Sequence, residues 1–206
     1  MDDGLAVFTR ASTKRLIAEG KENWAYETYT ASLWINILAD PNLMPINTSK
    51  SFLYRPEYYV GKGRCDLVIC QSGLEKDLRT GFKDLPKSIQ AIGIPFLAVE
   101  FKGSDKSDDK VTIGIDQMKQ AMEYIADWKY RNQIIFGAVA KGTQIQFHGV
   151  TVANPAASPG QKGIVIGGLN IDNVYKGPSV LDLTKLEDQT TIFKVLEYIK
   201  ESRPFL

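Results

Sequence analysis

Three charged residues beside two apolar stretches are the first candidates for chemistry. Glu100 and Lys102 follow the apolar run 96–99, and Asp66 precedes the apolar run 67–70. If both runs are β-strands, Glu100 and Lys102 point to the same face, because side chains alternate along a strand. Charges in such a setting are costly unless they are paired or used. If the strands pair, Asp66 and Glu100 converge, and two carboxylates form an oxygen-rich site that suits Mg²⁺.

Other catalytic chemistries have little support in the composition. The single histidine, His148, has no His or Cys partner, which disfavours histidine metal sites and Ser–His triads. Cys65 and Cys70 lack a metal-ligand spacing, so both are interpreted as reduced packing residues. The groups that remain as candidates for catalysis are carboxylates, lysines and a cation that the carboxylates bind. Such a cation polarises a phosphoryl oxygen and activates water, and a neighbouring lysine neutralises charge in the transition state.

A helix is predicted over residues 21–39, before Asp40-Pro41, because proline disfavours continuation. Its stripe has helical spacing and consists of Trp24, Glu27, Ala31, Trp34 and Leu38. Glu27 is the carboxylate in that stripe. It is preferred as a site residue over Glu22, which would lie in the first turn and suit the helix dipole there. The first ten residues give no strong signal.

The rest of the chain predicts strands and two further helices. Residues 51–60 and 64–70, separated by a glycine turn, indicate a β-hairpin. After a polar connection at 72–95, a strand is expected at 96–102, a helix at 115–129, and strands at 133–140, 143–152 and 164–171. A last helix should begin near Asp188 as N-cap. This order predicts one α/β domain over 1–206, with a central mixed β-sheet flanked by helices.

Asp66 followed by Glu100-Phe101-Lys102 at the end of a strand resembles the PD-(D/E)XK nuclease superfamily. The order α-β-β-β-α-β is similar to the restriction-endonuclease-like core of that superfamily. The resemblance covers about 20–150 and leaves a C-terminal strand and helix extension at about 153–206. The proline of the motif is absent, since Cys65 precedes Asp66, and 72–95 has the character of an insertion.

The resemblance implies a role for each site residue. Asp66 and Glu100, with the backbone carbonyl of Phe101, would ligate Mg²⁺ or Mn²⁺. Lys102 would position the attacking water. Glu27 would match the acidic residue that many members carry on the first helix, and would assist through a bridging water or a second metal.

A Gln-x-x-x-Tyr pattern on the predicted 115–129 helix matches several branches of the superfamily. Gln120 and Tyr124 are four residues apart and share a helix face, so both could reach the metal site or the nucleic-acid backbone. Gln117, one turn earlier, is the competing glutamine.

The expected function is therefore a divalent-metal-dependent endonuclease that hydrolyses phosphodiester bonds, with DNA favoured over RNA. Two alternatives stay open. One is a non-catalytic nucleic-acid-binding protein that keeps the nuclease fold, because a fold does not guarantee chemistry. The other is an interaction module in which the motif is coincidental.

Charge and hydropathy bear on partners and location. The chain has 25 Lys and Arg against 24 Asp and Glu, a formal charge of +1, which disfavours avid general nucleic-acid binding but allows a local basic groove. No apolar run approaches the roughly 18 residues of a membrane span, and the N-terminus is acidic, so a soluble, cytoplasmic protein is expected.

A homodimer is expected, because two sites cut two strands. Residues 153–206 would supply its contact or complete the core of the monomer.

Overall fold

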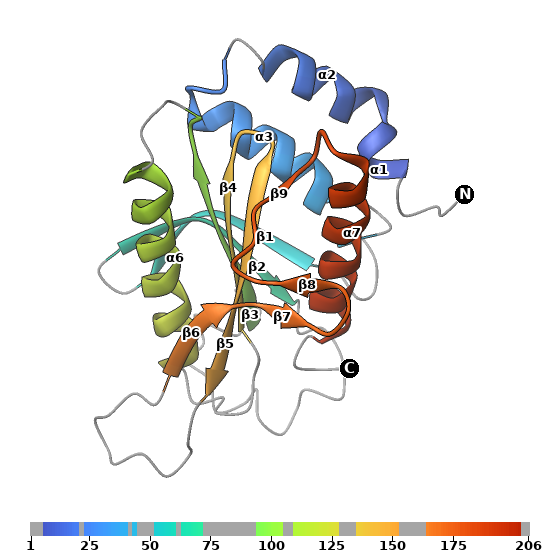
Figure 1. Cartoon of the computed structure of the whole chain (residues 1–206). Coiled ribbons are helices and arrows are strands. Elements are labelled where there is room, and N and C mark those ends of the chain that lie inside the picture. The colour runs from blue at the N-terminus through green and yellow to red at the C-terminus, as the bar shows by residue number, and fades with distance from the viewer. Residues whose placement is uncertain are drawn as a thin grey trace.

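The computed structural model describes residues 6–20, 23–40, 43–44, 52–60, 63–71, 94–104, 109–127, 135–152 and 164–202. Its centre is a sheet with the strand order β1-β2-β3-β4-β5-β6, in which β9 also pairs with β5 (Figure 1). The strands of this sheet are β1 (Phe52–Val60), β2 (Gly63–Gln71), β3 (Ile94–Lys102), β4 (Ile135–Lys141), β5 (Gln144–Val152), β6 (Ile164–Gly168) and β9 (Leu181–Asp182).

The predicted hairpin is confirmed by β1 and β2, which pair in antiparallel register from Phe52 opposite Gln71 to Val60 opposite Gly63. β3 continues the sheet antiparallel to β2, and β4 then runs parallel to β3. A parallel neighbour requires a crossover, and helix α6 (Asp109–Asp127) provides it. The sheet is therefore mixed, as the order of predicted elements indicated.

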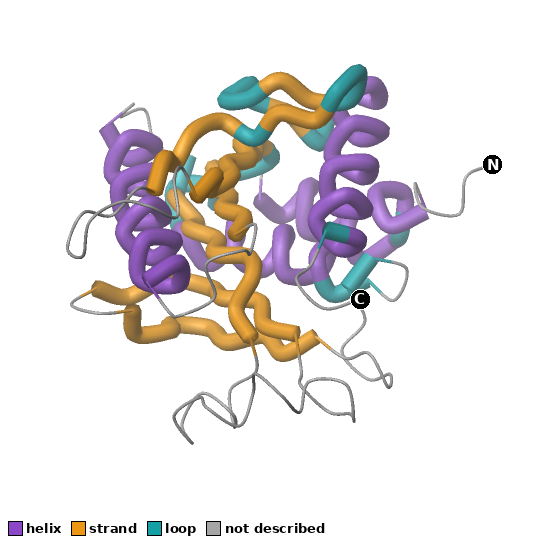
Figure 2. The backbone as a smooth tube through the Cα atoms, turned by 90° about the horizontal axis from the view of Figure 1, so that it is seen from below, coloured by secondary structure: helices purple, strands orange, loops and turns teal. Residues whose placement is uncertain are grey.

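Helices cover both faces of the sheet. Figures 1 and 2 show α6 on one side and helices α3 (Glu27–Leu38) and α7 (Leu186–Glu201) on the other. Two buried clusters correspond to these layers. Leu97, Val99 and Phe101 of β3 belong to the cluster that includes α3 and α7, whereas Ala98 belongs to the cluster with Met118 of α6. Alternation along β3 therefore assigns Glu100 and Lys102 to the α6 side.

The C-terminal segment is part of this core. α7 buries an apolar stripe in the same cluster as α3, and β9 extends the sheet beside β5. The stripe consists of Ile192, Val195, Leu196 and Ile199. Full burial of such a side chain is worth roughly 1.5–3 kcal/mol. Of the two roles considered for residues 153–206, completion of the monomer's core is the one that α7 and β9 perform.

Several predicted boundaries differ from the structure. The helix expected over 21–39 begins only at Glu27. Trp24 lies in the preceding turn, where its backbone N–H bonds to Gly20 and its ring packs against that glycine. Glu27 therefore lies in the first turn of its helix, where Glu22 had been predicted to lie. Glu22 and most of the predicted 72–95 connection lie outside the described residues.

Two helices near the N-terminus were not predicted, α1 (Ala6–Thr9) and α2 (Ala11–Gly20). The last helix begins at Leu186 rather than at Asp188. The Asp188 carboxylate accepts the backbone N–H of Asp182 instead of capping its own helix. Among the described residues, none of the helices has the length and apolar character needed to cross a membrane.

Candidate active site

The charged residues singled out in the sequence meet at the C-terminal end of β3. The ammonium nitrogen Nζ of Lys102 lies 3.2 Å from Oε2 of Glu100, 3.5 Å from Oδ2 of Asp66 and 3.9 Å from Oε1 of Glu27. The carboxylates come from three elements, β3, β2 and α3. A single ammonium group thus lies close to acids that are up to 73 positions apart in the chain.

The pairing of β2 with β3 positions Asp66. The last recorded pair of that ladder is Leu67 with Val99, so the same register sets Asp66 opposite Glu100. Opposite residues of an antiparallel pair have their Cβ atoms about 4.5–5.5 Å apart. The backbone N–H of Phe101 donates to Oδ2 of Asp66 at 2.8 Å. This bond holds the Asp66 carboxylate against the end of β3.

The start of α3 positions Glu27. The turn before the helix packs directly on the residues after Lys102, where the backbone N–H of Ser104 donates to the carbonyl of Trp24. A Cβ atom at Gly103 would lie 2.1 Å from the carbonyl oxygen of Ala25, so only glycine allows this approach. As a result, the first residue of α3 lies beside the end of β3.

The site is closed on one side and open on the other. The Glu100 and Lys102 side chains are 1% and 7% exposed, whereas those of Asp66 and Glu27 are 22% and 52% exposed. Gly114 of α6 allows close packing over Lys102, because a Cβ atom there would lie 3.1 Å from Cε of that lysine. Solvent or a ligand therefore approaches from the Asp66 and Glu27 side.

Burial and mutual charge shift the acid–base properties of the two inner residues. Burial, reinforced by the negative charge of Asp66, raises the pKa of Glu100 to about 7, and the Lys102 ammonium only partly opposes this. Burial alone would lower the pKa of Lys102, but the carboxylates of Asp66 and Glu100 outweigh burial and raise it. Lys102 is therefore a cation at neutral pH, next to a carboxyl group that is poised between its two forms.

The oxygen atoms present suit a hard divalent cation. Oε1 of Glu100 is buried and has no hydrogen-bond partner within the described part of the chain. Such an orphaned carboxylate oxygen beside Asp66 fits a Mg²⁺ or Mn²⁺ ion, which prefers oxygen ligands. In the described ranges no group of three or more Asp, Glu, His or Cys side chains is arranged to hold a metal. A cation held by Asp66 and Glu100 would therefore need further ligands.

The predicted helix pair lies farther from this centre. Gly114 of α6 lies close to Lys102, and Gln120 is exposed six positions later, roughly 9 Å along the helix axis. In the described structure no hydrogen bond joins Gln120 to the four charged residues. Gln117, also exposed, is one turn nearer to Gly114. Tyr124 lies on α6, and its side chain is outside the described residues.

Residues that sequence reasoning missed hold the site together. Thr30 is buried in α3 and bonds to the backbone of both Lys102 and Gly142, and Gly103 permits the approach of the turn before α3. Neither residue type carries a sequence signal for this role. The strands on either side of residues 141 and 142 were predicted, but the contact of the turn between them with α3 was not.

The remaining reactive side chains serve as packing residues. Cys65 and Cys70 are free and buried, and burial raises the pKa of both thiols, that of Cys70 to about 12. His148 is buried on β5, and burial, with the nearby positive charge of Lys119, lowers its pKa to about 4. These groups are therefore neutral at physiological pH, as their interpretation as structural residues predicts.

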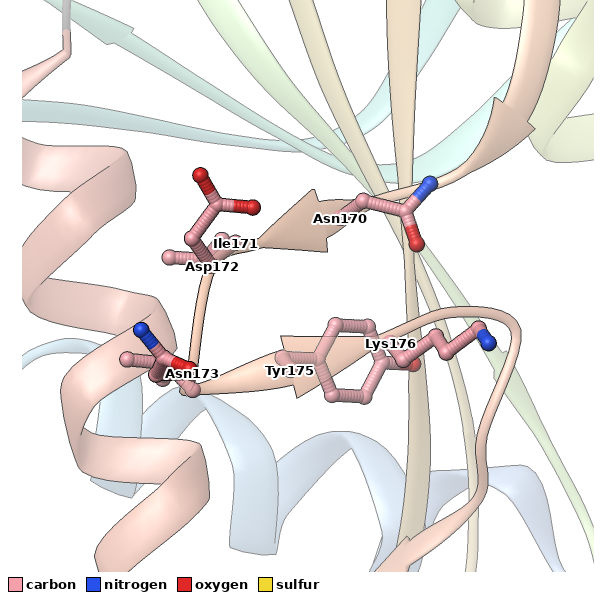
Figure 3. A pocket seen from close by; sticks show the side chains of 7 residues that line it. Asn170, Ile171, Asp172, Asn173, Tyr175 and Lys176 are labelled. Carbon is pink, nitrogen blue, oxygen red and sulfur yellow. The ribbon is translucent and has the colours of Figure 1, made fainter.

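A separate pocket of about 440 Å³ lies along the small hairpin of β7 (Asn170–Ile171) and β8 (Tyr175–Lys176) (Figure 3). It is lined by residues 170–176 and by none of the four charged site residues. The Tyr175 hydroxyl is already used, because it donates to the carbonyl of Ser179 and accepts the N–H of Phe147. The pocket therefore adds nothing to the chemistry at the end of β3.

No protein-family model, no curated protein and no solved structure matches the chain.

Proposed function

We propose that the chain is a divalent-metal-dependent nuclease that hydrolyses DNA phosphodiester bonds. The observation that carries the proposal is the cluster at the end of β3, where the Lys102 ammonium lies within 3.9 Å of carboxylates from β2, β3 and α3. The element order α3, β1, β2, β3, α6, β4 supports the proposal further, since it is the order expected of a PD-(D/E)XK core.

Asp66 and Glu100 would hold Mg²⁺ or Mn²⁺ together with the carbonyl oxygen of Phe101. The cation, when bound, would supply electrophilic activation of a phosphoryl oxygen and acidify a bound water. Lys102 would orient the attacking water and offset negative charge that develops on the phosphate. Glu27, the most exposed of the acids, would accept a hydrogen bond from a second water at the open side of the site.

The site is acidic as a whole, with three carboxylates around one ammonium. A phosphodiester would be repelled by these groups in the absence of a cation. Substrate binding should therefore be coupled to cation binding, which agrees with a formal charge of only +1 for the chain.

A cleavage panel with a matched inactive variant tests the proposal. Supercoiled, linear duplex, branched and single-stranded DNA, and RNA, would be incubated with Mg²⁺, Mn²⁺ or EDTA. Wild-type protein should cut DNA only with a divalent cation, and Glu100→Gln purified in parallel should not. DNA binding without cleavage would identify a non-catalytic binding protein. If the protein neither binds nor cuts DNA, the motif is coincidental.

We further propose that the nuclease acts as a homodimer, so that two sites address two strands. The apolar stripe of α7 is buried within the monomer, so the contact must use another surface. Sedimentation velocity with and without DNA would test this against the 23.0 kDa monomer mass.

A further inference from the structure

Thr30 connects three parts of the site through one hydroxyl group. Its side chain is fully buried in α3, and its Oγ1 atom donates to the backbone carbonyl of Lys102 at 3.0 Å. The same atom accepts the backbone N–H of Gly142 at 3.0 Å. The hydroxyl therefore joins the helix, the end of β3 and the turn between β4 and β5.

Both backbone polar groups of Gly142, its N–H and its carbonyl, are hydrogen-bonded to side chains of α3. Its N–H bonds to Thr30, and its carbonyl oxygen accepts the indole N–H of Trp34 at 2.9 Å. Gly142 has a φ of +59°, a conformation that glycine adopts without steric cost. Glu27, Thr30 and Trp34 have the spacing i, i+3, i+7, so the helix face that presents Glu27 is also the face anchored to the turn.

The contact between Glu27 and Lys102 is too weak to fix their separation by itself. The two atoms are 3.9 Å apart, and the Glu27 side chain is about half exposed, a situation in which an ion pair contributes little. Thr30 is one helical turn from Glu27 and bonds directly to the backbone of Lys102. It is thus a buried polar group that links the helix of Glu27 to the backbone of Lys102.

We propose that Thr30 is a positioning residue for the active site, which fixes Lys102 and the Glu27 helix relative to each other. This inference rests on the proposed nuclease function. Replacing Thr30 by valine keeps the shape of the side chain but removes both hydrogen bonds. The end of β3 and the start of α3 then lose their buried polar connection, and small displacements of catalytic groups are costly to the reaction step.

The experiment compares Thr30→Val with Thr30→Ser and with a matched control, Thr13→Val. Thr13 is also fully buried and also makes two hydrogen bonds, donating to the carbonyl of Val7 and accepting from Asn36 Nδ2. It lies in α2, and its partner Asn36 lies more than two helical turns from Glu27 in α3. Thr30→Val should lower kcat about 10- to 100-fold with little change in KM. Thr30→Ser should restore kcat, and Thr13→Val should retain it. Equal kcat in Thr30→Val and Thr13→Val would overturn the assignment.

A measurement without catalysis separates this inference from the proposed function. In lysine-labelled protein, the ε-methylene NMR signal of Lys102, identified by its loss in Lys102→Met, reports the position of the ammonium. It should move in Thr30→Val and stay in Thr30→Ser and Thr13→Val, while the Gly142 amide exchanges faster only in Thr30→Val. If wild-type protein fails to cut DNA, the nuclease proposal fails. The positioning role then stands if the Lys102 signal moves, and falls if it does not.

Discussion

The backbone N–H of Phe101 donates a hydrogen bond to Oδ2 of Asp66, with 2.8 Å between the two atoms. This hydrogen bond lies just beyond the last residue pair of the β2–β3 ladder, Leu67 with Val99. The Asp66 carboxylate thus satisfies a backbone donor of the neighbouring strand. It is held by this bond as well as by the more distant Lys102 ammonium, at 3.5 Å.

This relationship predicts that Asp66→Asn and Asp66→Ala differ in stability but not in activity. Asparagine keeps an oxygen that can accept the Phe101 N–H, whereas alanine leaves that donor without its partner. Asp66→Ala should lose about 1–2 kcal/mol of unfolding free energy, and Asp66→Asn should lose less. Both should lose cation-dependent cleavage, because each removes a charged oxygen that would ligate the proposed cation. Urea unfolding with EDTA and a cleavage assay measure the two effects. Cleavage at the wild-type rate by both variants would remove Asp66 from the site.

Glu100→Gln should stabilise the metal-free protein at alkaline pH. The folded protein holds the pKa of Glu100 at about 7, above the ordinary value of 4.5. Between these values the folded state binds more protons than the unfolded state, so wild-type stability falls as pH rises from about 4.5 to 7. The full penalty, on the order of 3 kcal/mol, applies above pH 7. Glutamine avoids it, because it does not ionise.

The measurement is the unfolding free energy of wild-type and Glu100→Gln protein from pH 4 to 8 in EDTA. The variant should be the more stable protein at pH 8, and the difference should shrink toward pH 4. Asp66→Asn provides a control, since removal of its charge should lower the pKa of Glu100 and weaken the wild-type pH dependence. A difference between wild type and Glu100→Gln that is constant with pH would contradict a raised pKa at this position.

Local patterns predicted the elements that carry most of the site. The hairpin β1–β2, strand β3 and the β4–β5 pair follow from alternation and glycine turns, which involve neighbouring residues only. The convergence of Asp66 and Glu100 follows from pairing adjacent strands. α2 was not predicted: its fully buried residues are Thr13 and Gly20, and its larger apolar side chains, Leu16 and Ile17, are only partly buried against the core.

Such local patterns could not predict the contacts that stabilise the site between residues far apart in the chain. Thr30 bonds to Lys102 and Gly142 across 72 and 112 positions of the chain. Its role depends on how α3 lies against the sheet, and a threonine in the middle of a helix gives no sign of that. The late start of α3 at Glu27 goes with a local contact instead, the packing of Trp24 against Gly20 in the preceding turn.

Lys102→Met should separate cation binding from the reaction. Methionine can fill the space beneath Gly114 that the lysine stem occupies, but it has no ammonium group. Cleavage should be lost, because Lys102 supplies the ammonium group beside these carboxylates. Mn²⁺ binding should persist, since lysine does not ligate metal while protonated and its removal leaves Asp66 and Glu100 in place. Isothermal titration calorimetry with Mn²⁺ is the measurement. Loss of binding together with cleavage would contradict this division of roles.

Gly103→Ala tests whether the approach of the turn before α3 is needed for activity. A Cβ atom at this position would lie 2.1 Å from the backbone carbonyl oxygen of Ala25, so one of the two chain segments must move. The hydrogen bond from Ser104 to Trp24 spans the same segments and would be strained or lost. Overpacking of this kind costs about 1–3 kcal/mol.

The matched control is Gly167→Ala on β6, where a Cβ atom meets nothing within 4 Å. This substitution should change stability by less than about 0.5 kcal/mol. Gly103→Ala should unfold at lower urea concentration and, at a temperature where both variants are folded, cut DNA more slowly than Gly167→Ala. The expected loss is in kcat, because Glu27 moves with α3 while Asp66 and Glu100 stay on the sheet. A Gly103→Ala protein that is less stable but fully active would show that the position of Glu27 does not matter for cleavage.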